Sequence, residues 1–501
     1  MLIVFFLLFC SVEEAWPQDT SRETTKQLSA RVCGSCHSAP TPDLLDKRSW
    51  RDVVLPRMGT FLGIYPKGVS RTSLIEKGAA ETYITSHNVY PEIPTIDAHT
   101  WKKVRDYYVR NAPSKLPKLA VTPLTVSKTF TAVRPAFSIQ PPSTTFVNID
   151  DKTGSVTIGD AVSGNVFSLT PQLSVVRRDS TGEAPAWITS NDDARIATIM
   201  GSFSPTDAPT GKVVWIPSDP KRSISEIITG LQRPVHHAVA DLDGNGESDI
   251  VICEFGKWTG GLSWWKCKKK GEYERISLRE GPGATRVEIR DWNRDGRLDV
   301  IALFAQGNEN ITAFINNGDG TFAEETVLQF PPSWGSSYFA VQDIDTDGDN
   351  DIIHCAGDNA DFGPLLRPYH GVRIFFNNGK NQFPDTVFLP LHGAYSAIAA
   401  DFDLDGDTDI SAISFFPDHK EKPVRGFVYY ENEGRGTYKT STFPEVGAGR
   451  WIVMDSGDID HDGDLDLILG SLVMEVKGRH DLVDNWVKNA IPFVILENRT
   501  R

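Results

Sequence analysis

A nine-residue acidic stretch recurs five times in this chain and constrains its fold more than any other feature. The copies begin at Asp241, Asp291, Asp343, Asp401 and Asp458, and they read DLDGNGESD, DWNRDGRLD, DIDTDGDND, DFDLDGDTD and DIDHDGDLD. Each copy has oxygen-bearing side chains at positions 1, 3, 5 and 9 and Gly at position 6. This alternation lets a short loop direct several oxygens at one hard cation, and Gly permits the sharp bend. We therefore expect up to five calcium-binding loops.

The predicted calcium ligands are the four oxygen-bearing residues of each loop. They are Asp241, Asp243, Asn245 and Asp249; Asp291, Asn293, Asp295 and Asp299; Asp343, Asp345, Asp347 and Asp351; Asp401, Asp403, Asp405 and Asp409; and Asp458, Asp460, Asp462 and Asp466. An EF-hand would need Glu at position 12 and a helix on each side. Here an apolar run such as DIVIC or DLILG follows at once. The pattern indicates a strand-loop-strand site.

The spacing of the loops predicts a repeat architecture. Successive copies start 50 to 58 residues apart, and each unit has room for about four short strands, which is the size of a propeller blade. Counting back by the same period reaches TSNDDARIATIMGSF and VNIDDKTGSVTIGD, which keep the strand pattern but not the ligand spacing. Two degenerate blades and five loop-bearing blades predict seven, over residues 144–501.

The net charge of -15 says little about partners, because 22 of the 66 acidic residues lie in the five loops. Five bound calcium ions would leave a net charge near -5. The acidity argues against a nucleic-acid partner. We expect the partner to be a redox protein, or a small-molecule or carbohydrate ligand.

The first 20 residues contain the apolar run MLIVFFLLFC, which is too short to span a bilayer and suits a secretory signal. Export to the periplasm or the cell exterior is therefore expected, where millimolar calcium suits such loops. Cys10 keeps a lipid anchor open as an alternative. We expect no transmembrane span.

Residues 22–115 contain a second motif, CGSCH, at Cys33, Cys36 and His37. CxxCH is the attachment signature of a c-type haem, since two thiols three residues apart reach the two vinyl groups and the next His reaches the iron. The helical run TTKQLSARV precedes the motif, and Trp101, Val104, Tyr107 and Tyr108 mark the core face of a later helix. The pattern predicts a small all-α haem domain.

Met58 is the only Met between residues 22 and 115 and lies 21 residues after His37. A thioether opposite His raises the potential of a haem used in electron transfer. Met58 is therefore our candidate for the second axial ligand, with His87 and His99 as alternatives. An iron open on that side would instead suit ligand binding.

Residues 116–143 form a Pro-rich linker, within which LTVSKTFTAV has a strand pattern. The last repeat ends one strand short of a complete blade, so a strand from about Leu124 to Val133 is predicted to close the ring. Cys253 and Cys267 flank the turn at Gly260 and Gly261, and either a disulfide or two buried thiols fits this placement.

The repeats resemble FG-GAP or VCBS repeats, the integrin-like propeller units. The CxxCH segment, with WRDVVLPRMGTFLG and WKKVRDYYVRNAP, is similar to cytochromes fused to such repeats in bacterial envelope proteins. The resemblance implies a small cytochrome c domain, one covalent haem, a seven-bladed propeller and calcium at the DxDxDGxxD loops. Asn245 and Asn293 depart from that loop pattern but still offer oxygen. The resemblance implies no settled activity.

Three long second turns, at residues 357–371, 415–426 and 474–491, should lie on the face opposite the acidic loops. Residues at the start of each first strand should gather near the central channel on that same face: His236, His237, Arg286, Tyr338, Tyr395, Arg450 and Trp451. A polar cluster of Asp358, Asn359, Asp361, Tyr369 and His370 is our candidate binding site there, because loops on a rigid scaffold carry function. No catalytic residue is predicted.

Three hypotheses follow for function. The first is an exported monohaem cytochrome whose propeller binds a partner or substrate. The second is a haem-linked oxidoreductase in which the propeller binds a substrate or a quinone cofactor. The third is a cell-surface adhesion or carbohydrate-binding module.

Overall fold

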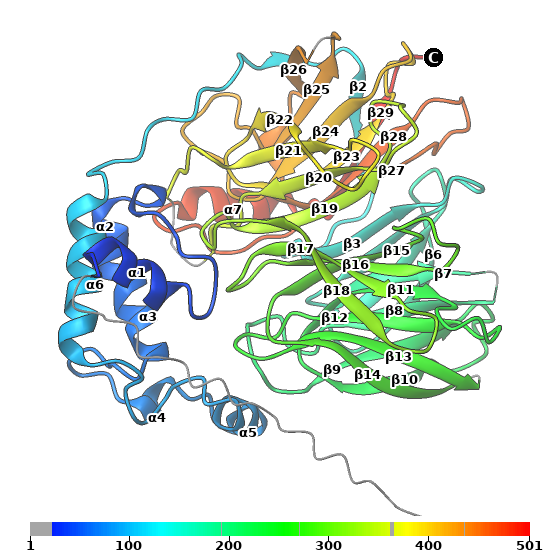
Figure 1. Cartoon of the computed structure of the whole chain (residues 1–501). Coiled ribbons are helices and arrows are strands. Elements are labelled where there is room, and N and C mark those ends of the chain that lie inside the picture. The colour runs from blue at the N-terminus through cyan, green and yellow to red at the C-terminus, as the bar shows by residue number, and fades with distance from the viewer. Residues whose placement is uncertain (1–22, 192, 270, 361–364, 435) are drawn as a thin grey trace, which may run out of the picture.

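The computed structural model describes residues 23–191, 193–269, 271–360, 365–434 and 436–501. The expected signal segment, Cys10 and Asp361 therefore lie outside the described residues. The rest of the chain forms a small helical segment and a seven-bladed β-propeller (Figure 1).

Each blade contains four antiparallel strands, in chain order except in blade 7, and blade 6 has a fifth strand that pairs in parallel at its edge. Blade 1 contains β3 (Thr144–Ile149), β4 (Val156–Asp160), β5 (Asn165–Leu169) and β6 (Val175–Ser180). Blade 2 contains β7 (Pro185–Ser190), β8 (Ala194–Ile199), β9 (Gly211–Pro217) and β10 (Ser225–Leu231). Blade 3 contains β11 (Pro234–Ala240), β12 (Asp249–Glu254), β13 (Gly261–Lys269) and β14 (Glu272–Glu280). Blade 4 contains β15 (Ala284–Arg290), β16 (Asp299–Phe304), β17 (Asn310–Asn316) and β18 (Phe322–Gln329).

The last three blades follow the same plan. Blade 5 contains β19 (Ser336–Gln342), β20 (Asp351–Ala356), β21 (Gly371–Phe376) and β22 (Asp385–Pro390). Blade 6 contains β23 (Ala394–Ala400), β24 (Asp409–Ser414), β25 (Phe427–Asn432) and β26 (Tyr438–Thr442). Blade 7 contains β27 (Trp451–Gly457), β28 (Asp466–Ser471) and β29 (Phe493–Asn498), and its fourth strand comes from the linker.

The ring closes through this linker strand. β2 (Phe130–Val133) pairs antiparallel with β29, with Phe130 opposite Asn498 and Val133 opposite Ile495. The sequence suggested one strand over 124–133, but the segment is divided: β1 (Thr125–Val126) pairs parallel with β26 of blade 6. The Ser127 side chain accepts hydrogen bonds from the backbone N–H groups of Thr129 and Phe130 and so fixes the turn between the two strands.

Burial explains the strand sequences. The second strands of the five loop-bearing blades, such as β12 and β16, are buried along their whole length, because both faces of each blade pack on its neighbours. They therefore read as continuous apolar runs and not as alternating ones. Fourth strands such as β14 lie at the rim and are largely exposed. First strands of adjacent blades contact each other all the way round the ring.

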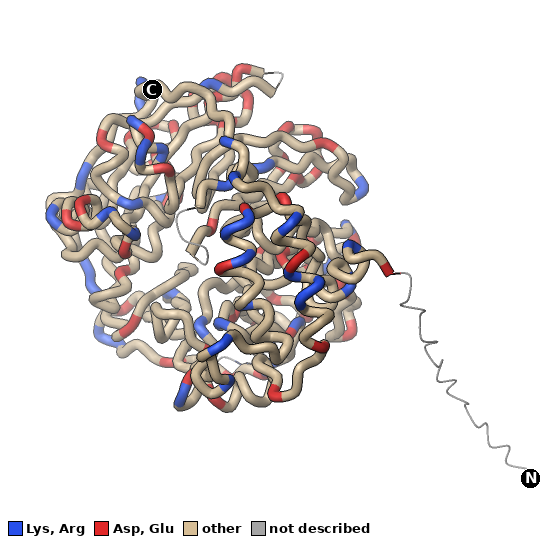
Figure 2. Tube along the Cα trace, turned by 90° about the vertical axis from the view of Figure 1, so that its left-hand side faces the viewer, with Lys and Arg blue, Asp and Glu red and all other residues tan. Residues whose placement is uncertain are grey.

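The helical segment lies on one face of the propeller, as the two views show together (Figures 1 and 2). Its helices are α1 (Thr25–Cys33), α2 (Lys47–Ser49), a π-helical turn (Trp50–Val54), α3 (Leu55–Phe61), α4 (Arg71–Leu74), α5 (Ala79–Ser86) and α6 (Ala98–Asn111). Short 3₁₀ turns occur at Pro42–Leu44 and Val446–Ala448, and α7 (His480–Asn489) belongs to the last insertion. A capping box formed by Thr24 and Gln27 starts α1.

Candidate functional sites

The five acidic loops share one backbone geometry. In each, the Gly at position 6 has positive φ, from +87° at Gly246 to +98° at Gly406, and its N–H donates to the position 1 carboxylate. Position 4 also has positive φ in every copy, although only the first has Gly there, at Gly244. The sequence pattern did not reveal this second left-handed position. A loop with two such residues turns the side chains of positions 1, 3 and 5 inward.

The Asp at position 9 holds each loop to the third strand of its blade. In blade 3, Asp249 Oδ2 accepts from Leu242 N (3.1 Å) and Oδ1 accepts from Cys267 N (2.7 Å). The same pair of bonds occurs at Asp299, Asp351, Asp409 and Asp466. Each carboxylate oxygen keeps a second lone pair, so position 9 can still meet a cation.

Carboxylates converge in four of the five loops. Ligand atoms lie within 4.8 Å of one another in the sets Asp241, Asp243 and Asp249; Asp343, Asp345 and Asp347; Asp401, Asp403 and Asp409; and Asp458, Asp460 and Asp466. Desolvation, together with repulsion from the neighbouring carboxylates Asp347 and Asp405, raises the pKa of Asp345 and of Asp403. A cation would relieve that repulsion.

Among the described residues, the second loop is the one of the five whose carboxylates do not form such a set. In the first loop Lys266 ion-pairs with the position 3 ligand Asp243 (2.5 Å). In the second loop the Arg297 guanidinium ion-pairs with Asp295, and Asn293 Nδ2 donates to the same carboxylate (2.9 Å). An internal cation thus occupies the position 5 ligand that a bound metal would need.

The CxxCH motif lies where α1 ends. Only Cys33 is helical, since Gly34 caps the helix and Cys36 follows in an exposed turn. His37 Nδ1 lies 2.9 Å from the Ser38 carbonyl oxygen. A carbonyl only accepts, so Nδ1 carries the proton of the neutral ring and Nε2 keeps a free lone pair.

Met58 and Cys33 belong to one apolar cluster. Both pack against a buried set that includes Val32, Trp101 and Tyr108, and burial raises the pKa of the Cys33 thiol. An ideal Cβ on the neighbouring Gly59 would lie 3.1 Å from Trp101 Nε1, so glycine there lets α3 approach α6 closely.

The alternative axial ligands lie elsewhere. His87 and His99 are both exposed, the first at the C-terminal cap of α5 and the second in the first turn of α6. His87 Nδ1 lies 2.9 Å from the Tyr83 carbonyl oxygen. Neither belongs to the apolar cluster that contains Cys33.

The helical segment contacts the insertion-bearing face of the propeller. Tyr369 Oη donates to the Leu44 carbonyl (2.9 Å), and Leu365 packs against the apolar cluster around Cys33. At a second contact, Glu76 accepts from Thr206 and lies 3.6 Å from Lys257. Phe61 meets Trp258 edge to face at 5.1 Å. The insertions do lie opposite the acidic loops, since first and second turns leave opposite ends of β12, β16 and their equivalents.

The predicted polar cluster is only partly assembled as a site. Asp358 lines a cavity at the channel, but Asn359 Nδ2 is bonded to Leu365 O (2.8 Å) within its own loop. His370 is buried, and desolvation lowers its pKa far below the usual value. The Tyr369 hydroxyl is hydrogen-bonded to the Leu44 carbonyl of the helical segment.

The first strands do converge on a central cavity. His236, Arg286, Tyr338 and Tyr395 line a volume of about 710 Å³, and Arg57 of α3 reaches the same space. His237 does not, because successive strand residues face opposite ways; its ring is bonded to Thr189 and Thr198 inside blade 2.

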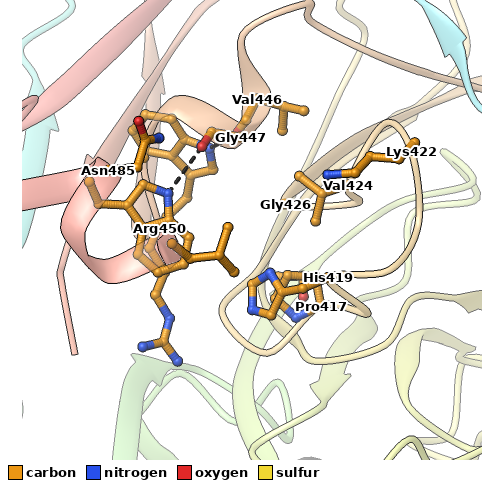
Figure 3. A pocket seen from close by; sticks show the side chains of 14 residues that line it. Pro417, His419, Lys422, Val424, Gly426, Val446, Gly447, Arg450 and Asn485 are labelled. Carbon is orange, nitrogen blue, oxygen red and sulfur yellow. Dashed lines mark hydrogen bonds between the residues drawn. The ribbon is translucent and has the colours of Figure 1, made fainter. Parts of the chain in front are cut away.

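Arg450 and Trp451 line a separate cavity of about 220 Å³ between the last two insertions (Figure 3). His419 and Lys422 come from one insertion and Asn485 and Trp486 from α7. Trp486 Nε1 donates to Gly447 O (3.0 Å), which holds α7 against the Val446–Ala448 turn.

Cys253 and Cys267 are free and buried, so the disulfide alternative is not what the structure has. Across the β12–β13 hairpin Cys253 faces Leu262, and Cys267 instead faces Tyr273 of β14. The hairpin turn is centred nearer to Cys253 than the sequence suggested.

Comparison with known families identifies the repeated unit. The model of the FG-GAP-like repeat matches residues 241–302 and 291–354. These segments are FG-GAP-like repeats. They span the acidic loops of blades 3 to 5, and the equivalent loops at Asp401 and Asp458 have the same backbone geometry.

Solved propellers resemble the chain at low identity. The Pan2 WD40 domain of Neurospora crassa is 13% identical with a TM-score of 0.46, over 75% of this chain and 97% of that one. Sqt1 of Saccharomyces cerevisiae is 9% identical with a TM-score of 0.43, over 75% and 100%. A putative 6-phosphogluconolactonase of Bacteroides fragilis is 13% identical with a TM-score of 0.40, over 59% and 82%. No curated protein matches the sequence.

Among the described residues, no helix combines the length and apolar character needed to cross a membrane.

Proposed function

We propose that this chain is an exported monohaem c-type cytochrome whose propeller, stabilised by calcium, binds the redox partner or substrate. The observation that carries the proposal is the CxxCH motif and its surroundings. His37 presents a free Nε2, and Met58 packs in the same apolar cluster as Cys33.

The residues present fit a covalent haem. Cys33 and Cys36 would hold the porphyrin through thioether bonds, and His37 Nε2 and Met58 Sδ would bind the iron. The hydrogen bond from His37 Nδ1 to Ser38 O fixes the ring orientation, as second partners of metal-binding His residues do. Bound there, haem supplies a one-electron redox centre. The apolar cluster excludes water from that side.

Met58 is favoured over His87 and His99 by its surroundings. Met58 would serve as the second protein ligand of the iron, because it shares its packing with Cys33. His87 and His99 are exposed side chains of other helices.

Calcium is proposed for the loops that begin at Asp241, Asp343, Asp401 and Asp458, where oxygens converge. The Asp291 loop is expected to bind calcium more weakly, because Arg297 already neutralises Asp295. In this proposal calcium stabilises the scaffold and takes no part in electron transfer.

One observation favours the oxidoreductase as a second candidate. The 710 Å³ cavity lies at the contact between the propeller and α3, so that Arg57, next to Met58, lines it. A small substrate or quinone cofactor in this cavity would lie beside the haem-bearing segment.

The test is expression with haem-attachment machinery, followed by denaturing electrophoresis with haem staining and a pyridine haemochrome spectrum. The denatured wild-type chain should keep a c-type haem spectrum. The double variant Cys33→Ala/Cys36→Ala should lose it. Absence of covalent haem from the folded wild-type protein would refute the proposal. Met58→Ala should abolish the Met-to-iron absorption band and lower the reduction potential. His87→Ala is the control and should change neither; the opposite pattern would assign the ligand to His87.

A further inference from the structure

The central cavity contains hydrogen-bond donors that no described residue satisfies. Its lining residues include Arg233, His236, Trp258 and Arg286. In each of them one side-chain nitrogen, namely Arg233 Nε, His236 Nε2, Trp258 Nε1 or Arg286 Nε, is buried without a hydrogen-bond partner among the described residues. A buried donor without a hydrogen-bond partner destabilises the folded chain. Four around one cavity indicate a group that accepts hydrogen bonds.

His236 adds a donor of defined direction. Its side chain is 6% exposed, and its Nδ1 accepts from Val287 N at 3.4 Å. Burial, with the positive charge of Arg286 nearby, keeps its pKa well below the usual value. The ring is therefore neutral with its proton on Nε2, the nitrogen that has no partner.

Arg286 is held by aromatic faces and not by a carboxylate. Its guanidinium lies 5.3 Å from the Trp187 ring centroid and 4.5 Å from that of Tyr338. Neither a hydrogen bond nor an ion pair joins its side chain to any described residue. Trp187 also stacks on His236, with centroids 4.1 Å apart. A flat aromatic surface and two N–H donors thus adjoin one space.

Among the described residues that line the cavity, cationic side chains outnumber carboxylates even without Arg57. Arg233, Lys257 and Arg286 line it, against the carboxylates Asp358 and Asp455. Asp455 is already bonded to Asn148 Nδ2 and Ile149 N, both at 3.0 Å. Lys257 faces Glu76 outside the lining. The remaining charge is therefore cationic. The cavity has low-dielectric walls, which strengthen the attraction of this charge for an anion.

We propose that this cavity binds a small organic anion with a flat aromatic body, its carboxylate facing Arg286, Arg233 and His236 Nε2 and its ring packed on Trp187. The volume of about 710 Å³ is within the usual range for small-molecule sites. The residues proposed to contact the anion, Arg233, His236, Arg286 and Trp187, all belong to the propeller, so binding does not require haem. A haem-free preparation that binds the anion would leave this inference intact even if the proposed cytochrome function failed.

The test is calorimetric titration of the full chain with benzoate, benzamide and inorganic phosphate. Benzoate binding, with benzamide and phosphate each at least tenfold weaker, is expected, since benzamide lacks the charge and phosphate lacks the ring. Equal binding of benzoate and benzamide, or no benzoate binding at concentrations up to 10 mM, would overturn the proposal.

Arg286→Met locates the site. It should weaken benzoate binding at least tenfold while leaving the melting temperature unchanged or higher, because it removes a cation that has no anionic partner among the described residues. Arg222→Gln is the matched control, since Arg222 also lies over a Trp ring, that of Trp215 at 4.6 Å, but outside the cavity. Undiminished binding by Arg286→Met would contradict the assignment. Should that variant fail to fold, the benzoate and benzamide comparison on the wild type still decides.

Discussion

Phe130 is the residue through which the linker strand closes the propeller. Its side chain is 3% exposed. It meets Tyr429 at 5.2 Å, Phe402 at 5.8 Å and Phe427 at 6.3 Å, all edge to face. These three rings belong to blade 6, whereas β2 is hydrogen-bonded to β29 in blade 7. Phe130 therefore joins the two blades.

Phe130→Ala should destabilise the propeller by about 3–5 kcal/mol, the usual cost of truncating a buried Phe. The upper half of that range is expected, because aromatic pairs add about 0.5–1.5 kcal/mol beyond burial. For a propeller of roughly 370 residues, with an unfolding entropy of about 2 cal/mol/K per residue, the melting temperature should fall by about 5–7 °C.

Scanning calorimetry of the full chain measures this shift, with the calcium concentration fixed. Val126→Ala is the control, since Val126 in β1 is 60% exposed and should change the melting temperature by less than about 1 °C. If Phe130→Ala and Val126→Ala melt alike, β2 does not hold the ring closed and the closure argument is wrong.

Two further predictions concern metal and pH. Chelation with EGTA should lower the melting temperature, since a site with a Kd of about 0.1–1 mM adds on the order of 1–3 kcal/mol at 10 mM calcium; identical melting in EGTA and calcium would exclude a stabilising role. Burial raises the pKa of Glu309 to about 7, so the folded chain keeps a proton that the unfolded chain releases, and stability should fall as pH rises from about 4.5 to 7. Glu309→Gln should remove about 3 kcal/mol of this pH-dependent loss of stability. Melting curves between pH 4.5 and 8 would then show a flatter dependence of melting temperature on pH than in the wild type. An unchanged dependence would contradict the prediction.

The repeat period was sufficient to predict the seven blades, because position 9 of each loop and the apolar run after it mark where a second strand begins. The closing strand was harder to define. Its partners, β26 and β29, lie more than 300 residues away, and no local pattern tells which residues pair with which. The break at Ser127 depends on side-chain hydrogen bonds that a run of alternating residues does not reveal.

Prediction of the acidic loops from the sequence was limited in a similar way. Oxygen spacing identified positions 1, 3 and 5, but the ion pairs of Arg297 with Asp295 and of Lys266 with Asp243 form only in the folded loops. The hydrogen-bond donors of the central cavity were harder still to predict from the sequence. His236 and Arg286 were identified as strand-entry residues, yet Arg233 and Trp258 come from turns, and their unsatisfied nitrogens are a property of the assembled ring.

The two faces of the propeller are suited to separate tasks. Each buried second strand runs from an acidic loop at one end to a second turn at the other, and the carboxylate at its first residue is bonded to the third strand. A cation bound in the loop would therefore help to hold the second and third strands of the blade in place. On the opposite face, Tyr369, Trp258 and Arg57 bring the helical segment and the channel cavity together. The redox chemistry and the ligand recognition that we propose would both take place at this contact, where the CxxCH segment and the unsatisfied donors lie on the same side of the ring.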